Sequence, residues 1–374
     1  MNEVSVLIGA DVVPALSNHA FFLNGRTCDI FDGVISDIWE NADVRVFNLE
    51  TPLYDGPSQI EKCGPHLKSP TASIHGLKML SPNLVLLANN HIMDSGFQGL
   101  DSTIEALNSE RIDYVGVGHS LKDMRKSRII EKDGLKIAFY NCAEKEFSIA
   151  TDQKSGANPF DFIDSFDDVA ELKRENDFVV VCYHGGKEFY PYPSPELQRI
   201  FRKFSDEGAD VVVAQHTHCV GCYETYKNST LIYGQGNFLF DMKNSQYVPY
   251  GLLIRLFFTK EKCRVEYVPL SFKQGKLFLL EDGSSCLLDF LSRSEQIKEE
   301  GFVEKKYNSF ARGMFPYYLR VLKGNSFFQK ILYKLLGPYY TRISSKDNLL
   351  AVQNFIECDA HRELLLEGLK WKNQ

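Results

Sequence analysis

Short apolar runs of strand length alternate with helical patterns over the first two thirds of the chain. The apolar runs span residues 4–8, 44–47, 84–87, 178–182 and 211–213. Between them, apolar residues recur at helical spacing in segments such as 29–40, 98–111 and 195–207. This alternation is typical of α/β proteins, in which helices cover a largely parallel sheet. Further strands are predicted at 252–258, 264–268 and 276–280, together with a hairpin over 129–139 that turns at Asp133-Gly134.

Each of the five apolar runs leads into residues that are suited to metal binding. These residues are Asp11, Glu50, Asn90 with His91, His184, and His216 with His218. Open α/β sheets bind ligands at the carboxyl ends of their strands, so the five endings are expected to converge on one site. A single histidine at a strand end would be weak evidence, because such a residue is more often part of the core or a cap.

The donors in this set suit Mn²⁺, Zn²⁺ or Fe better than Ca²⁺, and they do not choose among the three. A carboxylate such as Glu50 could bridge two ions about 3.5 to 4 Å apart, the separation that two-metal hydrolases use. Two ions lower the pKa of a shared water toward about 7 and neutralise an oxyanion, which favours phosphoester substrates. His91, next to Asn90, is the candidate proton donor to the leaving group.

Five ordered segments resemble motifs of the CapA capsule-synthesis family. They are Asn48–Leu53, Ala88–His91 with Asp94 and Gly96, His184–Glu188 with Pro193, Gly208–His218, and Tyr233–Phe238. The resemblance covers roughly residues 4 to 270. The CapA family is associated with poly-γ-glutamate and other capsule synthesis and is similar to the calcineurin-like metallophosphoesterases. It implies an α/β fold, a four-layer α/β/β/α sandwich of two mixed sheets flanked by helices.

The same resemblance assigns roles to individual residues. One ion would be held by Asp11 and His218, and the other by Asn90, His184 and His216, with Glu50 between the two ions. His91 would be the catalytic acid, oriented by Asp94. The wider superfamily has a histidine where this chain has Val13, so Thr51 or water would have to complete the first ion's ligands.

Three further residues are candidates for substrate binding, each with a plainer interpretation beside it. Lys68 could face an anionic substrate, or it could lie on an ordinary polar surface. Glu188 could contact substrate or orient His184, and a solvated loop explains it equally well. Asn237 could add a polar contact, although the glycines around it are explained by a tight turn.

The character of the chain changes after about residue 285. We therefore predict a metallophosphoesterase-like domain over residues 1–284 and a helical C-terminal extension over 285–374. Within the extension, residues 305–346 contain no acidic residue, nine lysines and arginines, and many aromatic residues. This segment could pack on the main domain, lie on an anionic membrane surface or synthase complex, or contact an anionic polymer.

The overall composition limits the class of protein. With 374 residues, 44% hydrophobic and 24% charged, the chain has the composition of a globular protein with a sizeable core. Its net charge of −7 argues against a general nucleic-acid binder. An odd count of nine cysteines favours a reducing compartment, and no leader or spanning segment is visible. A cytoplasmic location is expected, with attachment to the inner face of the membrane as the variant that residues 305–346 suggest.

These features predict a metal-dependent hydrolase with two divalent ions. Its substrate would be an anionic phosphoester or polymer, and its role would lie in capsule, poly-γ-glutamate or exopolysaccharide biosynthesis. Two alternatives remain open at this point. The chain could be a non-catalytic accessory subunit of a polymer synthase, or it could hydrolyse an amide or isopeptide bond of the polymer.

Overall fold

The computed structural model describes residues 3–25, 29–62, 64–241, 249–322 and 327–336, together with residues 349, 352, 353 and 356. The chain divides into two compact units, Met1–Glu304 and Lys305–Gln374. Helix α8 (Ser285–Gln296) lies in the first unit, so the division falls later than the boundary predicted at 284. The reason is that Cys286 and Phe290 of α8 are buried against Val220 and Leu252 of the main domain.

The first sheet has eight strands in the order β16-β15-β14-β1-β2-β3-β4, with β13 paired to β1. Strands β1 to β4 and β13 pair in parallel, whereas β14, β15 and β16 pair antiparallel, so the sheet is mixed. The strand bounds are β1 Val4–Val12, β2 Val44–Leu49, β3 Leu84–Leu86, β4 Tyr114–Val115, β13 Asn237–Leu239, β14 Tyr250–Phe258, β15 Cys263–Lys273 and β16 Lys276–Leu279.

The second sheet has six strands in the order β11-β12-β10-β9-β7-β6 and is also mixed. Its strand bounds are β6 Arg128–Lys132, β7 Leu135–Ala143, β9 Phe178–His184, β10 Val211–Gln215, β11 Tyr223–Tyr226 and β12 Ser229–Ile232. A small third sheet pairs β5 (Val117–Gly118) with β8 (Gly156–Ala157). The predicted hairpin turn joins β6 to β7, with Asp133 and Gly134 both at positive φ (49° and 77°).

The two large sheets pack face to face through one apolar core. Residues such as Val6 and Val46 of the first sheet share it with Phe139, Val180 and Val213 of the second. Separate cores lie on the two outer faces, beneath helices. The helices over the first sheet are α1 His19–Leu23, α2 Gly33–Glu40, α3 Ile74–Met79 and α4 Gly96–Ser109, and those over the second are α6 Asp164–Glu175 and α7 Pro195–Asp206.

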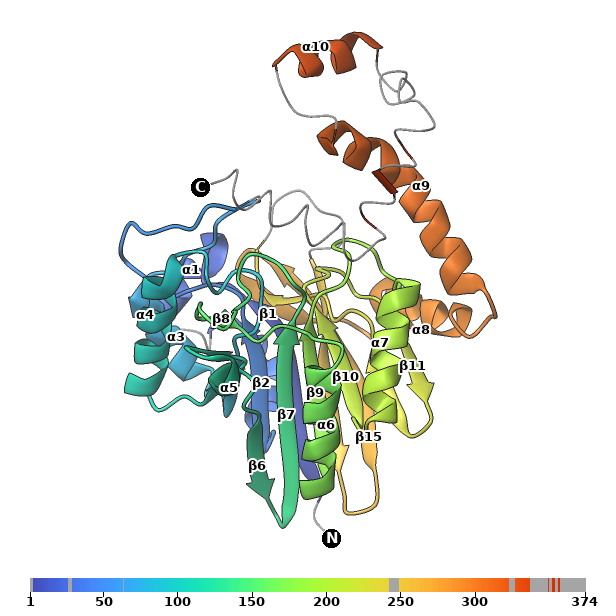
Figure 1. Ribbon diagram of the computed structural model, residues 1–374. Coiled ribbons are helices and arrows are strands. Elements are labelled where there is room, and N and C mark those ends of the chain that lie inside the picture. Colours follow the sequence, from blue (N-terminus) through green and yellow to red (C-terminus); the bar gives the residue numbers. More distant parts are fainter. Residues whose placement is uncertain are drawn as a thin grey trace. The chain divides into compact units, whose positions relative to one another are not determined.

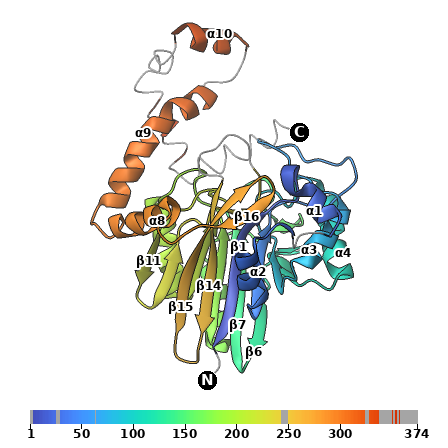
Figure 2. The same cartoon turned by 180° about the vertical axis from the view of Figure 1, so that it is seen from behind.

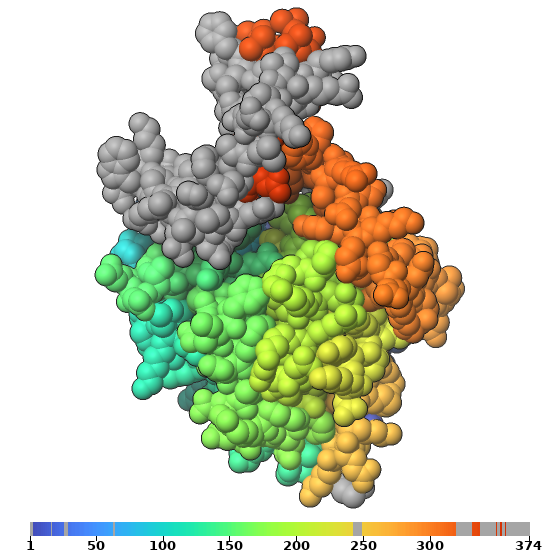
Figure 3. Space-filling view, turned by 45° about the vertical axis from the view of Figure 1, so that its right-hand side comes forward, coloured from blue at the N-terminus to red at the C-terminus, as the bar shows by residue number. Residues whose placement is uncertain are grey.

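The result is a four-layer α/β/β/α sandwich of two mixed sheets, which confirms the predicted architecture (Figures 1 and 2). In the space-filling view, residues coloured green to yellow-green form much of the outer surface on the side of α6 and α7 (Figure 3). A short helix, α5 (Leu121–Met124), precedes the hairpin.

Local sequence explains where the helices begin. Helix α7 starts at Pro195 because the Ser194 hydroxyl oxygen accepts a hydrogen bond from Leu197 N (3.0 Å). Helix α2 begins at Gly33, later than the predicted residue 29, because Asp32 is its cap and accepts from Ile35 N (2.8 Å).

The second unit contains most of α9 (Phe302–Leu322) and all of α10 (Phe327–Leu336). Leu335 is 75% exposed, and Phe315 and Tyr317 are both 52% exposed. Within the described ranges, no helix combines the length and the apolar character that crossing a bilayer requires. Other parts of the predicted basic segment, including residues 323–326 and 337–346, lie outside the described residues.

Candidate metal centre

Strand register brings the predicted ligands to one edge of the sandwich. In the first sheet, Asp11 of β1 pairs with Asn48 of β2 and with Asn237 of β13, both in parallel register. In the second sheet, Gln215 at the end of β10 pairs with His184 at the end of β9. Parallel strands end on the same side, so the residues that follow them share an edge.

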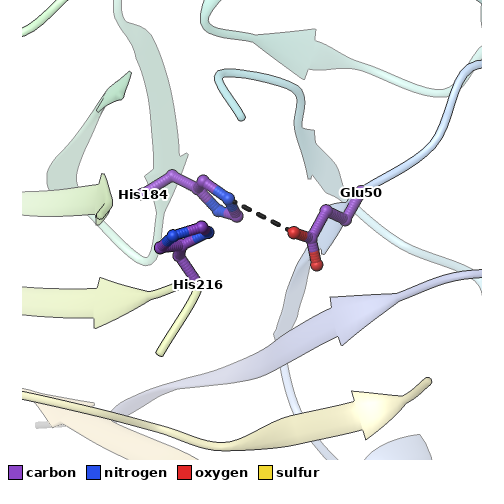
Figure 4. Close-up of side chains that lie close together, drawn as sticks. All are labelled: Glu50, His184 and His216. Atoms are coloured by element: carbon purple, nitrogen blue, oxygen red, sulfur yellow. Dashed lines mark ion pairs between the residues drawn. The ribbon is translucent and has the colours of Figure 1, made fainter. Parts of the chain in front are cut away.

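Two groups of potential metal ligands form at this edge, and they have one carboxylate in common. Asp11, Glu50 and His218 make one group, and Glu50, His184 and His216 make the other. Within each group, one ligand atom from every residue lies within 4.8 Å of the others. Figure 4 shows His184 and Glu50 turned toward each other, with the His216 ring beside them. Glu50 is therefore placed where it can bridge two ions.

The distances around His184 match those between neighbouring ligands of one ion. Its Nε2 atom lies 3.4 Å from Glu50 Oε1 and 3.0 Å from Asn90 Oδ1. Two ligands at about 2.1 Å from an ion lie roughly 3.0 to 3.4 Å apart when they occupy adjacent positions. Asn90 Oδ1 therefore lies close enough to His184 to be a ligand of the same ion.

The Glu50 carboxylate is buried and has no hydrogen bonds, as expected for a group that binds metal. Glu50 is 0% exposed, and neither of its carboxylate oxygens has a hydrogen-bond partner. Buried polar groups normally have partners, and a buried carboxylate in particular requires compensation. A divalent cation provides it, so these residues fit a metal.

The pKa directions support this interpretation. Burial, reinforced by the nearby Glu50, raises the pKa of Asp11 to about 8. Burial also raises the pKa of Glu50 and lowers those of His184 and His216 well below the usual value. The imidazoles of His184 and His216 are therefore neutral, which is the form that binds metal.

Hydrogen bonds orient Asp11 and His218, two members of the first ligand group. Asn48 Nδ2 donates to Asp11 Oδ1 (2.7 Å), and the backbone N–H of His216 donates to Asp11 Oδ2 (3.3 Å). His218 Nδ1 lies 2.9 Å from Asn237 Oδ1, so the ring donates there and leaves Nε2 for a metal. Asn237, a predicted substrate contact, is 2% exposed and makes this contact with His218.

The candidate acid His91 lies beside its predicted partner. His91 Nδ1 is 2.6 Å from Asp94 Oδ2, and Leu67 N donates to the same oxygen (2.7 Å). Lys62 was not predicted: its Nζ forms an ion pair with Asp94 and lies 3.1 Å from His91 Nδ1. Only 3% of the Lys62 side chain is exposed. Sequence carried no signal for this role, because a lysine in a polar loop is normally solvated.

Of the remaining predicted residues, Glu188 lies near the clustered ligands and Lys68 does not. Lys68 is exposed and its Nζ donates to Gly56 O (2.8 Å), so the structure gives it no place among the clustered ligands. Glu188 lies 3.9 Å from His216 Nε2, close to the cluster. Val13 is buried, and the Thr51 hydroxyl donates to Pro52 O (3.4 Å).

Comparison with known proteins places the chain in a family. The family model described as bacterial capsule synthesis protein PGA_cap matches residues 6–242. The chain belongs to this family. The resemblance to CapA is confirmed, and every residue of the candidate metal centre lies inside the matched range.

Curated relatives carry related names. The chain is 29% identical over 255 residues to the capsule biosynthesis protein CapA of Bacillus anthracis, covering 64% of this chain and 61% of that protein. It is 32% identical over 212 residues to the PGA biosynthesis protein CapA of Bacillus subtilis, covering 55% and 56%. A probable polyglutamine synthesis accessory protein of Mycobacterium tuberculosis is 28% identical over 214 residues. The chain thus spans little more than half of the length of these relatives.

Solved structures give weaker likenesses. A novel phosphatase from Mycoplasma pneumoniae has a TM-score of 0.46 at 14% identity, covering 72% of this chain and 94% of its own. A putative 5'-nucleotidase from Staphylococcus aureus has a TM-score of 0.44 at 13% identity, covering 82% and 58%.

Proposed function

We propose that this PGA_cap protein is a metal-dependent hydrolase of phosphoesters that acts in the synthesis of a capsule, poly-γ-glutamate or another exopolymer. The observation that carries the proposal is the position of Glu50, a fully buried carboxylate without hydrogen bonds that belongs to both ligand groups. A structural role would have given such a carboxylate hydrogen-bond donors. A site for two cations explains why it has none.

The ligand residues define what the centre would hold. Asp11 and His218 would bind one divalent ion, Asn90, His184 and His216 the other, and Glu50 both. The ligand types suit Mn²⁺, Zn²⁺ or Fe. When bound, such a pair supplies a hydroxide near neutral pH and neutralises an anionic phosphoryl group.

His91 would complete the reaction as the proton donor. Its Nδ1 is held by Asp94, which leaves Nε2 for the leaving-group oxygen, and the side chain is 9% exposed. Lys62 fixes Asp94 from a neighbouring loop, and Ile60 N in that loop donates to the Asp94 carbonyl (3.1 Å). His91 and Asp94 are therefore expected to act as one hydrogen-bonded unit.

A second function is favoured by the name of the mycobacterial relative, an accessory protein of polymer synthesis. In that case the chain would keep the fold and act as a non-catalytic subunit. Cleavage of an amide or isopeptide bond by the same activated water is a variant of the first proposal, and poly-γ-glutamate is the substrate that tests it.

Metal analysis combined with activity separates these functions. Protein purified without chelators is expected to contain about two ions per chain, and it should hydrolyse a chromogenic phosphodiester such as bis(p-nitrophenyl) phosphate. His91→Ala should keep the metal and lose the hydrolysis. Metal-free protein that fully supports polymer synthesis in cells would overturn the enzymatic proposal and favour the accessory role.

A further inference from the structure

A third group of potential ligands adjoins the two that share Glu50. It consists of Glu188, His216 and His218, again with ligand atoms within 4.8 Å of one another. Its two histidines come one from each of the first two groups. We propose that Glu188 is a further metal ligand of this centre, contributed from its solvent-exposed side; the inference rests on the metal site proposed above.

Two backbone hydrogen bonds fix the loop that carries Glu188 against the turn that carries the histidines. Gly185 N donates to Gln215 O (3.0 Å), and Phe189 N donates to Thr217 O (2.8 Å). The donors lie on either side of Glu188 and the acceptors on either side of His216. The backbone that carries Glu188 is therefore fixed next to the backbone that carries His216.

Both the turn that carries the histidines and the loop that carries Glu188 contain residues with positive φ. His216 and His218 have positive φ values of 90° and 50°, which are uncommon for residues other than glycine. Gly186 has a φ of 98°, and a Cβ there would lie 3.2 Å from the Thr217 methyl group, tighter than most such contacts. Strained conformations of this kind persist where the surroundings enforce them, and they cluster at functional sites.

The distance between Glu188 and His216 fits two ligands of one ion. Glu188 Oε1 lies 3.9 Å from His216 Nε2, which is too long for a hydrogen bond. Two ligands at about 2.1 Å from one ion can be at most about 4.2 Å apart, so the distance is compatible with a shared cation. Among the described residues, no hydrogen bond to the Glu188 carboxylate is found.

The exposure of Glu188 distinguishes it from the other carboxylates. Its side chain is 41% exposed, whereas Asp11 and Glu50 are 0% exposed. Replacing it therefore removes a ligand without leaving an unpaired charge in the core. Its removal should weaken metal binding and leave the fold intact, which makes the inference testable.

The experiment is a metal titration of Glu188→Gln in the absence of any substrate. We expect calorimetry with Mn²⁺ or Zn²⁺ to show at least a roughly tenfold weaker dissociation constant for one ion, and the visible spectrum of the Co²⁺ form to change. Glu188→His, which restores a ligand atom, should recover much of the affinity. Glu196→Gln, an exposed carboxylate of α7 paired with Arg199, is the matched control and should bind metal as the wild type does.

The outcomes separate this inference from the proposed function. If the wild type binds metal and Glu188→Gln binds it equally well with an unchanged Co²⁺ spectrum, Glu188 is not a ligand, and a raised KM would make it a substrate contact. If the wild type itself binds no metal, the proposed metal centre fails. Thermal unfolding in chelator checks the fold; should Glu188→Gln unfold there, Glu188→His and the Co²⁺ spectrum decide.

Discussion

Replacing Glu50 by glutamine should leave the protein at least as stable as the wild type when no metal is present. The same replacement should abolish most of the increase in Tm that metal causes in the wild type. In the structure the carboxylate has no hydrogen bond to lose, and its burial raises its pKa. Glutamine has nearly the same shape and no charge, so the cost of burying an ionised group beside Asp11 disappears. A structural glutamate would behave in the opposite way.

The size of the metal response follows from mass action. At a free metal concentration of 100 times the dissociation constant, one bound ion stabilises the folded state by about 2.7 kcal/mol. The unfolding entropy scales with size, so for the unit Met1–Glu304 each kcal/mol raises Tm by roughly 1.5 °C, and one bound ion should raise the wild-type Tm by about 4 °C. Because Glu50 belongs to both ligand groups, Glu50→Gln should lose most of this gain for either ion.

Differential scanning calorimetry with chelator and with Mn²⁺ or Zn²⁺ measures both effects. The matched control is Glu224→Gln, which also removes a buried carboxylate charge. Glu224 accepts hydrogen bonds from Arg202 Nε (2.9 Å) and Tyr233 OH (2.6 Å), so this variant should lose stability in both conditions and keep the metal response. If Glu50→Gln is destabilised in chelator as strongly as the control, or keeps the full metal response, the reasoning is refuted.

Three further predictions concern catalysis, pH and the C-terminal segment. His91→Ala should lower kcat for a phosphodiester by about 10² to 10⁴-fold, and metal analysis should show an unchanged ion content, because His91 is in neither ligand group that contains Glu50. In chelator, the free energy of unfolding should fall as pH rises from about 6.5 to 8, because folded Asp11, with its pKa raised to about 8, keeps a proton that the unfolded chain releases. Below about pH 6.5 the lowered pKa values of His184 and His216 oppose this effect, since the unfolded chain protonates both residues there. Urea titrations should show the slope above about pH 6.5, and saturating metal should reduce it. The 374-residue protein should bind anionic vesicles in a salt-sensitive manner, as measured by cosedimentation. Replacing Lys330 and Lys334 by glutamine should weaken this binding by roughly 2 kcal/mol, or about thirtyfold. Unchanged binding would favour packing or a polymer contact for this segment.

The pattern of the sequence predicted an α/β fold because its strongest signals are those of buried strands, whereas the four-layer sandwich was implied by the resemblance to CapA. Apolar runs such as 178–182 have to be covered on both faces, and the observed β9 extends from such a run to His184. Helix α6 was not predicted, because only Phe166, Val169 and Leu172 form its apolar stripe in an otherwise polar segment. Short strands such as β11 and β13 were missed for a related reason: pairing with neighbours defines them more than composition does.

The candidate site shows where sequence reasoning ends. Metal ligands at strand ends could be predicted because parallel register is a repeating rule, and the rule brings Asp11, His184 and His216 to one edge. The loops follow no such rule. Lys62 reaches Asp94 from 32 residues away, and Lys68, six positions further along, turns to Gly56 instead. Which lysine of a polar loop is buried depends on the path of that loop, and this is fixed by contacts such as Leu67 N to Asp94 that leave no pattern in the sequence.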